Sequence, residues 1–375
     1  MSTGAYIGVN NVARKIKNGY EGVNNVARRI TKAYIGIGGK ARPCWSAEKG
    51  ASYYGKIADL SQARCYLSAT TVGDYALFGG GTNWSSYFDV VNAYNKSLTR
   101  RNPTVLSAVR CDLSATTVGD YALFGGGRTG SAANAVSSDV VDAYNASLTR
   151  STPTALSTAR HALAAASVGD YALFCGGLTS STVGKVVDAY NASLTRSTPT
   201  ALSTAMYYHD AASVGDYALF GGTMGSSVVI SYNKSLTRSN ATALSTARHS
   251  LAATTVGDYA LFGGGRDSGS NAMDVVDAYN ASLTRSTPTA LSTARHSLAA
   301  TFVGDYALFG GGYISTGSDA SAVVDSYDTA LTRTTATELN TARAVLAATS
   351  IGNYALFGGG DAKGMPSAVV DAYTV

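Results

Sequence analysis

Hydrophobic and polar residues alternate in short runs along most of this chain, and one arrangement returns seven times. Each copy contains the segment V-G-D-Y-A-L-F-G-G-G or a close variant, in which two apolar runs flank a Gly-Asp pair. Two apolar runs around such a two-residue turn predict a β-hairpin. A second hairpin is predicted downstream, where V-V-D-A-Y and L-T-R-S-T-P-T-A-L-S flank a short N-A-S or N-K-S turn. Each repeat is therefore expected to form four short strands.

The spacing of the repeats identifies the architecture. The copies begin at Val72, Val118, Val168, Val214, Val256, Val303 and Ile351. The start-to-start distances are 46, 50, 46, 42, 47 and 48 residues, and they differ only between the third position of G-G-G and the following V-V. That stretch has 8, 12, 8, 4, 9 and 10 residues in the first six repeats. Four strands at such a period are typical of a β-propeller blade, so the sequence predicts seven blades with one variable loop each.

The two ends of the repeat region complement each other. The sequence ends after the third strand of the last repeat, and Tyr53–Leu60 stands where a fourth strand stands elsewhere. This segment is expected to complete the seventh blade and close the ring, which leaves no open sheet edge. The small residues of each first strand suit a position beside a central axis. The sequence thus predicts an all-β fold: a seven-bladed propeller over residues 51–375, preceded by a separate segment at residues 1–50.

Two features of each repeat carry a family resemblance. An apolar strand ends in a double glycine, as at Gly79 and Gly80, and a tyrosine follows downstream. The tyrosines are Tyr94, Tyr144, Tyr190, Tyr232, Tyr279, Tyr327 and Tyr373. Over residues 53–375 these features resemble the kelch family of β-propellers, although Leu148 and its equivalents stand where kelch repeats usually carry a Trp. The resemblance implies the fold, and it implies ligand binding on the face that carries the variable loops. It leaves the function open, since kelch propellers include actin binders, adaptors and a copper oxidase.

Residues 1–50 contain a different repeat, of 14 residues. Tyr6, Tyr20 and Tyr34 each begin a unit that reads approximately Y-x-G-V, an Asn-Asn or Gly-Gly turn, and V-A-R-x-I. The pattern predicts three small hairpins, and such arrays look like those at the ends of structural proteins of tailed bacteriophages with Gram-positive hosts. Nine Lys and Arg against two Glu give this segment a net charge of +7, whereas 20 basic and 22 acidic residues give the remainder −2.

Isolated hairpins are only marginally stable in water, so this segment is expected to dock on a partner or on copies of itself. The cationic residues expected to anchor it are Arg14, Lys15, Arg28, Arg29 and Arg42.

Composition narrows the class of protein. Charged residues are 14% of the chain, and 24 Tyr stand against six Pro, which is typical of a strand-rich folded chain. No apolar run is long enough for a membrane span, and the first residues lack the charged and apolar regions of a secretion signal. The cysteines have no C-x-x-C spacing, so we expect free thiols. They are Cys44, Cys65, Cys111 and Cys175.

Variation between repeats is expected to concentrate on one face of the propeller. The loop between the second and third strands of a blade opens on the same face as the residues that enter the first strand. We expect a ligand to contact the positions on this face that depart from the repeat. These are Cys65, Tyr66, Trp84, Tyr87, Asp112, Arg128, His161, Tyr207, Tyr208, His209, His249, Arg266, His296 and Tyr313. Arginines that recur in nearly every blade are assigned a structural role instead, such as pairing with Asp142 or Asp277.

His161, His249 and His296 raise a metal-binding alternative, because radical-copper enzymes of the kelch family bind metal near the axis through His and Tyr. Here the histidines fall on the third, fifth and sixth blades, and no carboxylate pattern accompanies them. We therefore expect no metal and no cofactor. The sequence contains no recognisable nucleophile and base, phosphate-binding loop or paired catalytic carboxylates, which predicts that the protein is not an enzyme.

These features favour a structural and binding protein of a bacteriophage virion, in a capsid decoration, head fibre or tail. Residues 1–50 would contact other virion or surface-assembly proteins, and the propeller would bind a host-surface glycan or protein. The first alternative is a cytoplasmic kelch-type adaptor for a protein partner. The second is an oxidase or lyase that uses the ring of histidines. No nucleic-acid partner is expected, and self-association of the chain stays open.

Overall fold

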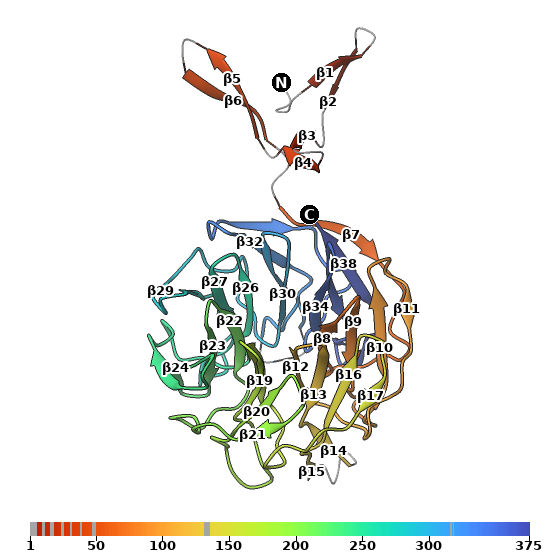
Figure 1. The fold of residues 1–375 in the computed structure, drawn as a ribbon, viewed down its shortest axis with the longest axis vertical. Helices are drawn as coiled ribbons and strands as arrows, with labels where there is room; N and C mark the ends of the chain where they lie inside the picture. The colour runs from red at the N-terminus through yellow and green to blue at the C-terminus, as the bar shows by residue number, and fades with distance from the viewer. Residues whose placement is uncertain are drawn as a thin grey trace. The chain divides into compact units, whose positions relative to one another are not determined.

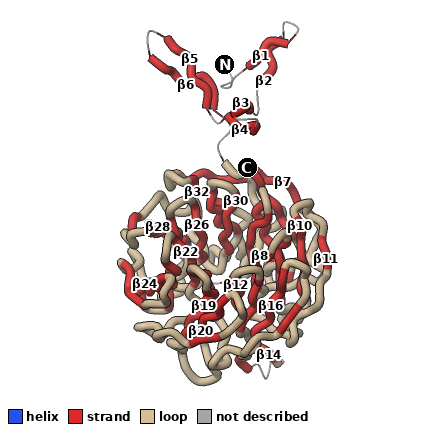
Figure 2. Tube along the Cα trace, in the orientation of Figure 1, coloured by secondary structure: helices blue, strands red, loops and turns tan. Residues whose placement is uncertain are grey.

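The computed structural model of this chain describes residues 50–375, except 131–135, 316 and 318, together with the backbone of six strands within the first 49 residues. The chain divides into two compact units, residues 1–50 and 51–375. Every regular element described in either unit is a β-strand (Figure 2). The described part of the chain accordingly has no helix of the length and apolar character needed to cross a membrane.

The described residues of the second unit form seven four-stranded antiparallel sheets around a central axis, which confirms the predicted seven-bladed propeller (Figure 1). The first strands are β8 (Ser68–Val72), β12 (Ser114–Val118), β18 (Ala164–Val168), β22 (Asp210–Val214), β26 (Ala252–Val256), β30 (Ala299–Val303) and β34 (Ala347–Ile351). The second strands are β9 (Tyr75–Gly79), β13 (Tyr121–Gly125), β19 (Tyr171–Cys175), β23 (Tyr217–Thr223), β27 (Tyr259–Gly263), β31 (Tyr306–Gly310) and β35 (Tyr354–Gly358).

The outer half of each blade is a second antiparallel pair. The third strands are β10 (Val91–Asn95), β16 (Val141–Asn145), β20 (Val187–Asn191), β24 (Ser226–Asn233), β28 (Val276–Asn280), β32 (Val324–Asp328) and β38 (Val370–Thr374). The fourth strands are β11 (Arg100–Arg101), β17 (Arg150–Ser151), β21 (Arg196–Ser197), β25 (Arg238–Ala241), β29 (Arg285–Ser286), β33 (Arg333–Ala336) and β7 (Ser52–Lys56). Two variable loops carry small hairpins of their own, β14 (Arg128–Thr129) with β15 (Val136–Ser137) and β36 (Asp361–Ala362) with β37 (Met365–Pro366).

The first strands contact one another in a closed circle around the axis, from β8 to β12 and onward to β34, which returns to β8. Their Ala, Ser and Thr side chains line a cavity of about 380 Å³. The first strands converge at the axis, where larger side chains would collide. The small residues therefore lie where the sequence analysis expects them, beside the axis. Phe302 is the exception: it stands where the other blades have Thr or Ser, and it also lines the cavity.

The ring closes through the strand that precedes the first repeat. Strand β7 pairs antiparallel with β38, and Tyr53 lies opposite Tyr373. The backbone N–H of Leu60 then donates to Ala368 O at 2.8 Å. The predicted closing role of Tyr53–Leu60 is therefore confirmed, and the seventh blade contains strands from both ends of the propeller.

Each blade packs onto the next through a phenylalanine and a tyrosine, and in every blade but the third a glycine makes room for the phenylalanine. A Cβ added at Gly79 would lie 2.8 Å from a ring carbon of Phe124 in the next blade, so the glycine leaves room for that ring. Phe124 is fully buried, and burying such a ring stabilises the fold by about 1.5–3 kcal/mol. The hydroxyl of Tyr144 donates to Thr104 O of the preceding blade at 2.8 Å. The same tyrosine bond recurs in every blade.

The recurring arginines pair with aspartates inside the blades. Asp142 forms ion pairs with Arg110, which precedes the first strand, and with Arg150 of the fourth strand. Asp277 likewise pairs with Arg248 at 2.8 Å. Equivalent buried pairs are formed by Asp188, Asp325 and Asp371. These pairs confirm the predicted structural role of the arginines. Removing one member of a buried pair would leave an uncompensated charge, at a cost of about 3–5 kcal/mol.

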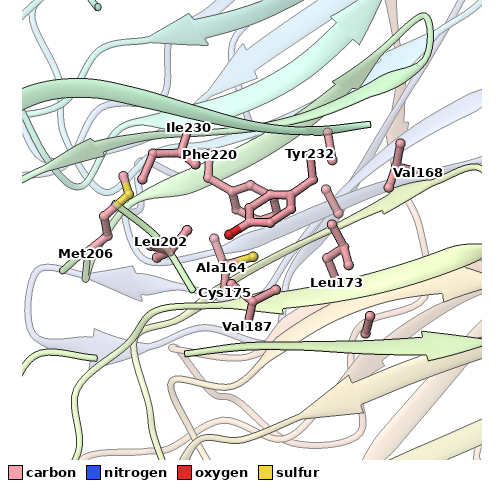
Figure 3. Packing of buried hydrophobic residues seen from close by; sticks show 13 residues of the cluster. Ala164, Val168, Leu173, Cys175, Val187, Leu202, Met206, Phe220, Ile230 and Tyr232 are labelled. Atoms are coloured by element: carbon pink, nitrogen blue, oxygen red, sulfur yellow. The ribbon is translucent and has the colours of Figure 1, made fainter. Parts of the chain in front are cut away.

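Two blades depart from this pairing. In the first, Asn92 replaces the aspartate and accepts a hydrogen bond from Arg64 Nη2 at 2.9 Å, and burial lowers the pKa of Arg64 to about 10. In the fourth, Met206 and Ile230 replace the arginine and the aspartate together. Both belong to a cluster of 13 buried apolar residues between the third and fourth blades (Figure 3).

The described strands of the first unit form three hairpins, as predicted. They are β1 (Tyr6–Val9) with β2 (Val12–Lys15), β3 (Gly19–Val23) with β4 (Val26–Ile30), and β5 (Lys32–Ile37) with β6 (Lys40–Ser46). The repeated arginine takes the same register in each hairpin, with Arg14 opposite Ile7, Arg28 opposite Glu21 and Arg42 opposite Ile35. The side chains of these arginines, of Lys15, Arg29 and Cys44, and hence the predicted anchoring contacts, lie outside the described residues.

Candidate ligand-binding face

The variable loops and the residues that enter the first strands lie on one face of the propeller, as predicted; we call it the variable face. In six blades the entry residue forms a short antiparallel bridge to the first residue of the variable loop. The bridges join Cys65 to Thr82, Cys111 to Arg128, His161 to Leu178, His249 to Arg266, His296 to Tyr313 and Ala344 to Asp361. In the fourth blade, Tyr207 N instead donates to Thr223 Oγ1 at 3.2 Å. The two variable positions of each blade therefore lie side by side.

A closed ring of seven backbone hydrogen bonds surrounds the axis on this face. Its members are Tyr66, Asp112, Ala162, Tyr208, Ser250, Ser297 and Val345. Each backbone N–H donates to the carbonyl of the member in the preceding blade, at N···O distances of 2.7–3.1 Å. All seven residues have φ between 46° and 54°, a region that residues other than glycine rarely adopt. The ring holds this strained backbone in place and so positions the side chains around the axis.

Three predicted residues, Tyr66, Asp112 and Tyr208, line a cavity of about 200 Å³ together with the other ring members. Asp112 forms an ion pair with Arg128. Burial raises the pKa of the Tyr66 and Tyr208 phenols, and the nearby Asp112 carboxylate raises both further. Burial also raises the pKa of Asp112, while Arg128 opposes that shift. This side of the cavity is aromatic and charged, whereas Ser250, on a later blade, gives it an uncharged hydroxyl.

Asp361 joins three blades. Its carboxylate accepts hydrogen bonds from the Tyr313 hydroxyl at 2.7 Å, from Trp84 Nε1 at 3.3 Å and from Gly364 N at 3.1 Å. Asp361 is 1% exposed, whereas Trp84 is 44% exposed. The Trp84 ring also meets Tyr66 edge to face, with the ring centroids 5.6 Å apart. Two predicted residues, Tyr313 of the sixth blade and Trp84 of the first, are thus held by one carboxylate.

Sequence reasoning missed Asp361 and the role of the ring. Asp361 begins the seventh variable loop, the position that singled out Arg128, Arg266 and Tyr313 in other blades, so the same criterion identifies it. The ring has no signal in residue type, because its members share only a backbone conformation.

The three histidines at entry positions are held apart by separate partners. His161 Nδ1 lies 3.0 Å from Ser137 Oγ, His249 Nε2 accepts from Arg266 Nε at 3.0 Å, and His296 Nδ1 lies 3.0 Å from Ser297 Oγ. Burial is the main cause that lowers the pKa of His161 and His249 to about 4, and it also lowers the pKa of His296. Within the described ranges, no three His, Cys, Asp or Glu side chains lie close enough to hold one metal ion.

Five residues of the predicted contact set are buried. Cys65, Cys111, His209, His249 and His296 are at most 6% exposed, and His209 also lines the cavity of the ring. Ligand contact by these residues stays a prediction. The cysteines Cys65 and Cys111 are free thiols, as predicted, and so is the buried Cys175.

The other predicted residues remain partly exposed on the variable face. Tyr207 stacks at a tilt on Tyr208, with the ring centroids 5.3 Å apart, and its hydroxyl lies 3.1 Å from Met224 Sδ. Tyr87 forms a backbone bridge to Thr82 across the first variable loop. Their position is compatible with ligand contact, which stays a prediction.

Comparisons with known proteins bear on the fold. No protein-family model matches the chain, and no curated protein sequence matches it. Among solved structures, the chain is similar to one titled "Structure of YjhT", with a TM-score of 0.56 and 12% sequence identity. The match covers 84% of this chain and 96% of that one. What they share is the propeller fold. The resemblances to kelch repeats and to bacteriophage proteins stay predictions.

Proposed function

We propose that this chain is a non-enzymatic binding protein that contacts a host-surface glycan or protein through its variable face. One observation carries the proposal. The framework of each blade keeps a constant length, while the variation in length and most of the variation in sequence lies in loops on one face. A rigid scaffold with one free loop per unit can change its binding surface without changing its core.

We propose further that residues 1–50 attach the propeller to a larger assembly, the virion of a bacteriophage, as part of a capsid decoration, head fibre or tail. Support comes from the three successive hairpins, their resemblance to repeats of tailed-phage proteins, and the net charge of +7 in this segment. A cationic repeat of this kind suits a repeated or anionic partner surface.

The non-enzymatic role is supported by how the polar groups of the variable face are used. Asp112 is paired with Arg128, and Asp361 accepts three hydrogen bonds that hold neighbouring loops. The histidines have lowered pKa values and hydrogen-bond to the loops beside them. These groups hold structure rather than forming a nucleophile and base aimed at one point.

An intracellular adaptor for a protein partner is the alternative. It is favoured by apolar side chains that five of the variable loops expose. They are Trp84, Val136, Met224, Ile314 and Met365, with exposed fractions of 44–68%. Aromatic residues and Met are enriched at protein interfaces, whereas charged residues are depleted there.

Deletion of residues 1–50 tests the proposal. We expect the shortened chain to keep its thermal unfolding transition and its binding to host cells but to be lost from purified particles. Particle incorporation that does not change on deletion would contradict the anchoring role. Binding to cytosolic proteins with no binding to the host surface would favour the adaptor.

A further inference from the structure

Departures from the repeat gather where the seventh blade meets the first. Gln62 stands where the other blades have Thr or Ala two residues before the buried arginine or its equivalent. Asp361 is the only acidic residue that begins a variable loop. Trp84 occurs in the first loop, and Pro366 ends the small hairpin of the seventh. The framework around these four residues is nearly the same as in the other blades, so the junction of the seventh and first blades has a surface of its own.

Trp84 is held in a fixed and strained position. Its φ is 73°, which is unusual for a bulky residue. Its backbone N–H donates to Thr82 Oγ1 at 3.0 Å, and the side chain of Asn83 accepts hydrogen bonds from Ser85 N and Ser86 N. The indole Nε1 is bound to Asp361, as described above. The loop thus presents a nearly half-exposed indole whose orientation is set before any ligand arrives, a form of preorganisation that reduces the entropy lost on binding.

A groove begins at the residue that precedes Trp84 in the chain. A cavity of about 510 Å³ is lined by Gln62, Ala63, Asn83, Phe88 and Pro366, and Asn83 directly precedes Trp84. The lining has two side-chain amides, one aromatic ring and one proline ring, with no charged side chain. The Gln62 amide can both donate and accept a hydrogen bond, whereas the Asn83 oxygen already accepts from the loop, which leaves the Asn83 amide N–H groups as donors.

This combination matches the chemistry of a sugar. The C–H groups on one face of a pyranose ring carry small positive charges and lie favourably on the electron-rich face of an indole. The hydroxyl groups around the ring then meet the amides of the groove, and the absence of a charged lining group favours an uncharged sugar. We propose that the junction of the seventh and first blades is a subsite for a neutral sugar ring that stacks on Trp84. The inference deepens the proposed function and rests on it.

Fluorescence of the indole gives a direct test, because the chain has only two tryptophans, Trp45 and Trp84. In the full chain with Trp45→Phe, emission reports on Trp84 alone. We expect a saturable change in emission when this protein is titrated with neutral oligosaccharides built from hexoses and N-acetylhexosamines. An unchanged emission spectrum across the whole panel overturns the inference.

Calorimetry on variants locates the site. Trp84→Ala should weaken binding of the oligosaccharide at least about tenfold, whereas Trp84→Phe, which keeps an aromatic face, should weaken it about threefold. Val375→Ala changes a similarly exposed residue that follows the third strand of the seventh blade, outside the variable loops, and serves as the matched control, with no expected effect. Equal thermal unfolding of all three variants separates lost contact from lost folding.

The outcomes distinguish the subsite from the proposed function. Binding of a neutral oligosaccharide that Trp84→Ala does not weaken overturns the subsite and leaves the proposed function intact. Binding only to anionic glycans, or only to a host-surface protein, has the same consequence. A full chain that binds neither glycan nor protein of the host surface contradicts the proposed function itself.

Discussion

The junction between the third and fourth blades is packed differently from the other six. It has apolar side chains at the positions where the others have a glycine and a buried polar pair. Elsewhere a glycine receives the next phenylalanine ring, and a buried arginine is paired with an aspartate or, in the first blade, with Asn92. Here Cys175 replaces the glycine, and Met206 and Ile230 replace the charged pair (Figure 3). The blade keeps its four strands. The comparison teaches that the fold does not require the charged pair, but that a buried arginine, where one is present, needs a polar partner such as an aspartate or Asn92.

The largest expected effect comes from breaking that rule. Met206→Arg places an arginine opposite Ile230, where no carboxylate can pair with it, and should destabilise the protein by about 3–5 kcal/mol. Adding Ile230→Asp recreates the pair of the other blades and should recover most of the loss. Urea unfolding of the two single variants and the double variant measures the coupling. A Met206→Arg protein that unfolds at the wild-type urea concentration would refute the argument.

A smaller effect is expected from moving the cysteine to an ordinary junction. A Cβ added at Gly263 would lie 2.7 Å from the ring of Phe309, so Gly263→Cys forces that ring to move. Overpacking of this kind costs about 1–3 kcal/mol. The control is Cys175→Gly, which removes the side chain where it is already accommodated and should cost less. Denaturation midpoints that rank the two variants in the opposite order would contradict this account.

The smallest effect concerns pH and His209, which stands where the other blades have leucine. Burial is the main cause that lowers the pKa of His209 from 6.5 to about 3. The folded ring therefore stays neutral, while the unfolded ring takes up a proton below about pH 6.5, so stability falls as the pH drops from about 6.5 toward 3. His209→Leu lacks this loss and should show a shallower fall in unfolding free energy between pH 6 and pH 4.

The neighbouring titratable groups do not reverse that expectation. Asp210, whose pKa burial raises to about 6, is present in both proteins, as are His161 and His249, so their contributions cancel in the difference. Urea unfolding at several pH values measures it. Parallel stability curves for the two proteins would show that His209 is not buried in a neutral form.

Periodicity made the fold predictable. A constant framework, one loop of variable length and the unmatched strand at Tyr53–Leu60 were sufficient to predict blade number, strand order and closure. The shared face of the loops and entry residues also followed, since strand order alone places them there. Pairing of the recurring arginines with Asp142 and Asp277 was predictable because an arginine and an aspartate that recur at fixed positions in most repeats are expected to make the same contact in each blade.

The candidate site was predictable only in part, because residue type does not reveal depth. His249 and Trp84 both depart from the repeat, yet one is buried beneath the variable face and the other is exposed on it. The contact of Tyr313 with Asp361 joins residues 48 positions apart on different blades, and no local pattern indicates it. The ring around the axis depends on backbone angles that serine, alanine, tyrosine and aspartate all adopt there.

The closing strand has a mechanical consequence. Strand β7 begins at Ser52, only two residues after the first unit ends at Gly50. Tension that enters the propeller through residues 1–50 therefore pulls first on the ladder between Ser52–Lys56 and Val370–Thr374, and not on any ladder within a single repeat. If the chain is tethered by its first unit and gripped elsewhere, the seam that seals the toroid sets the force at which it opens.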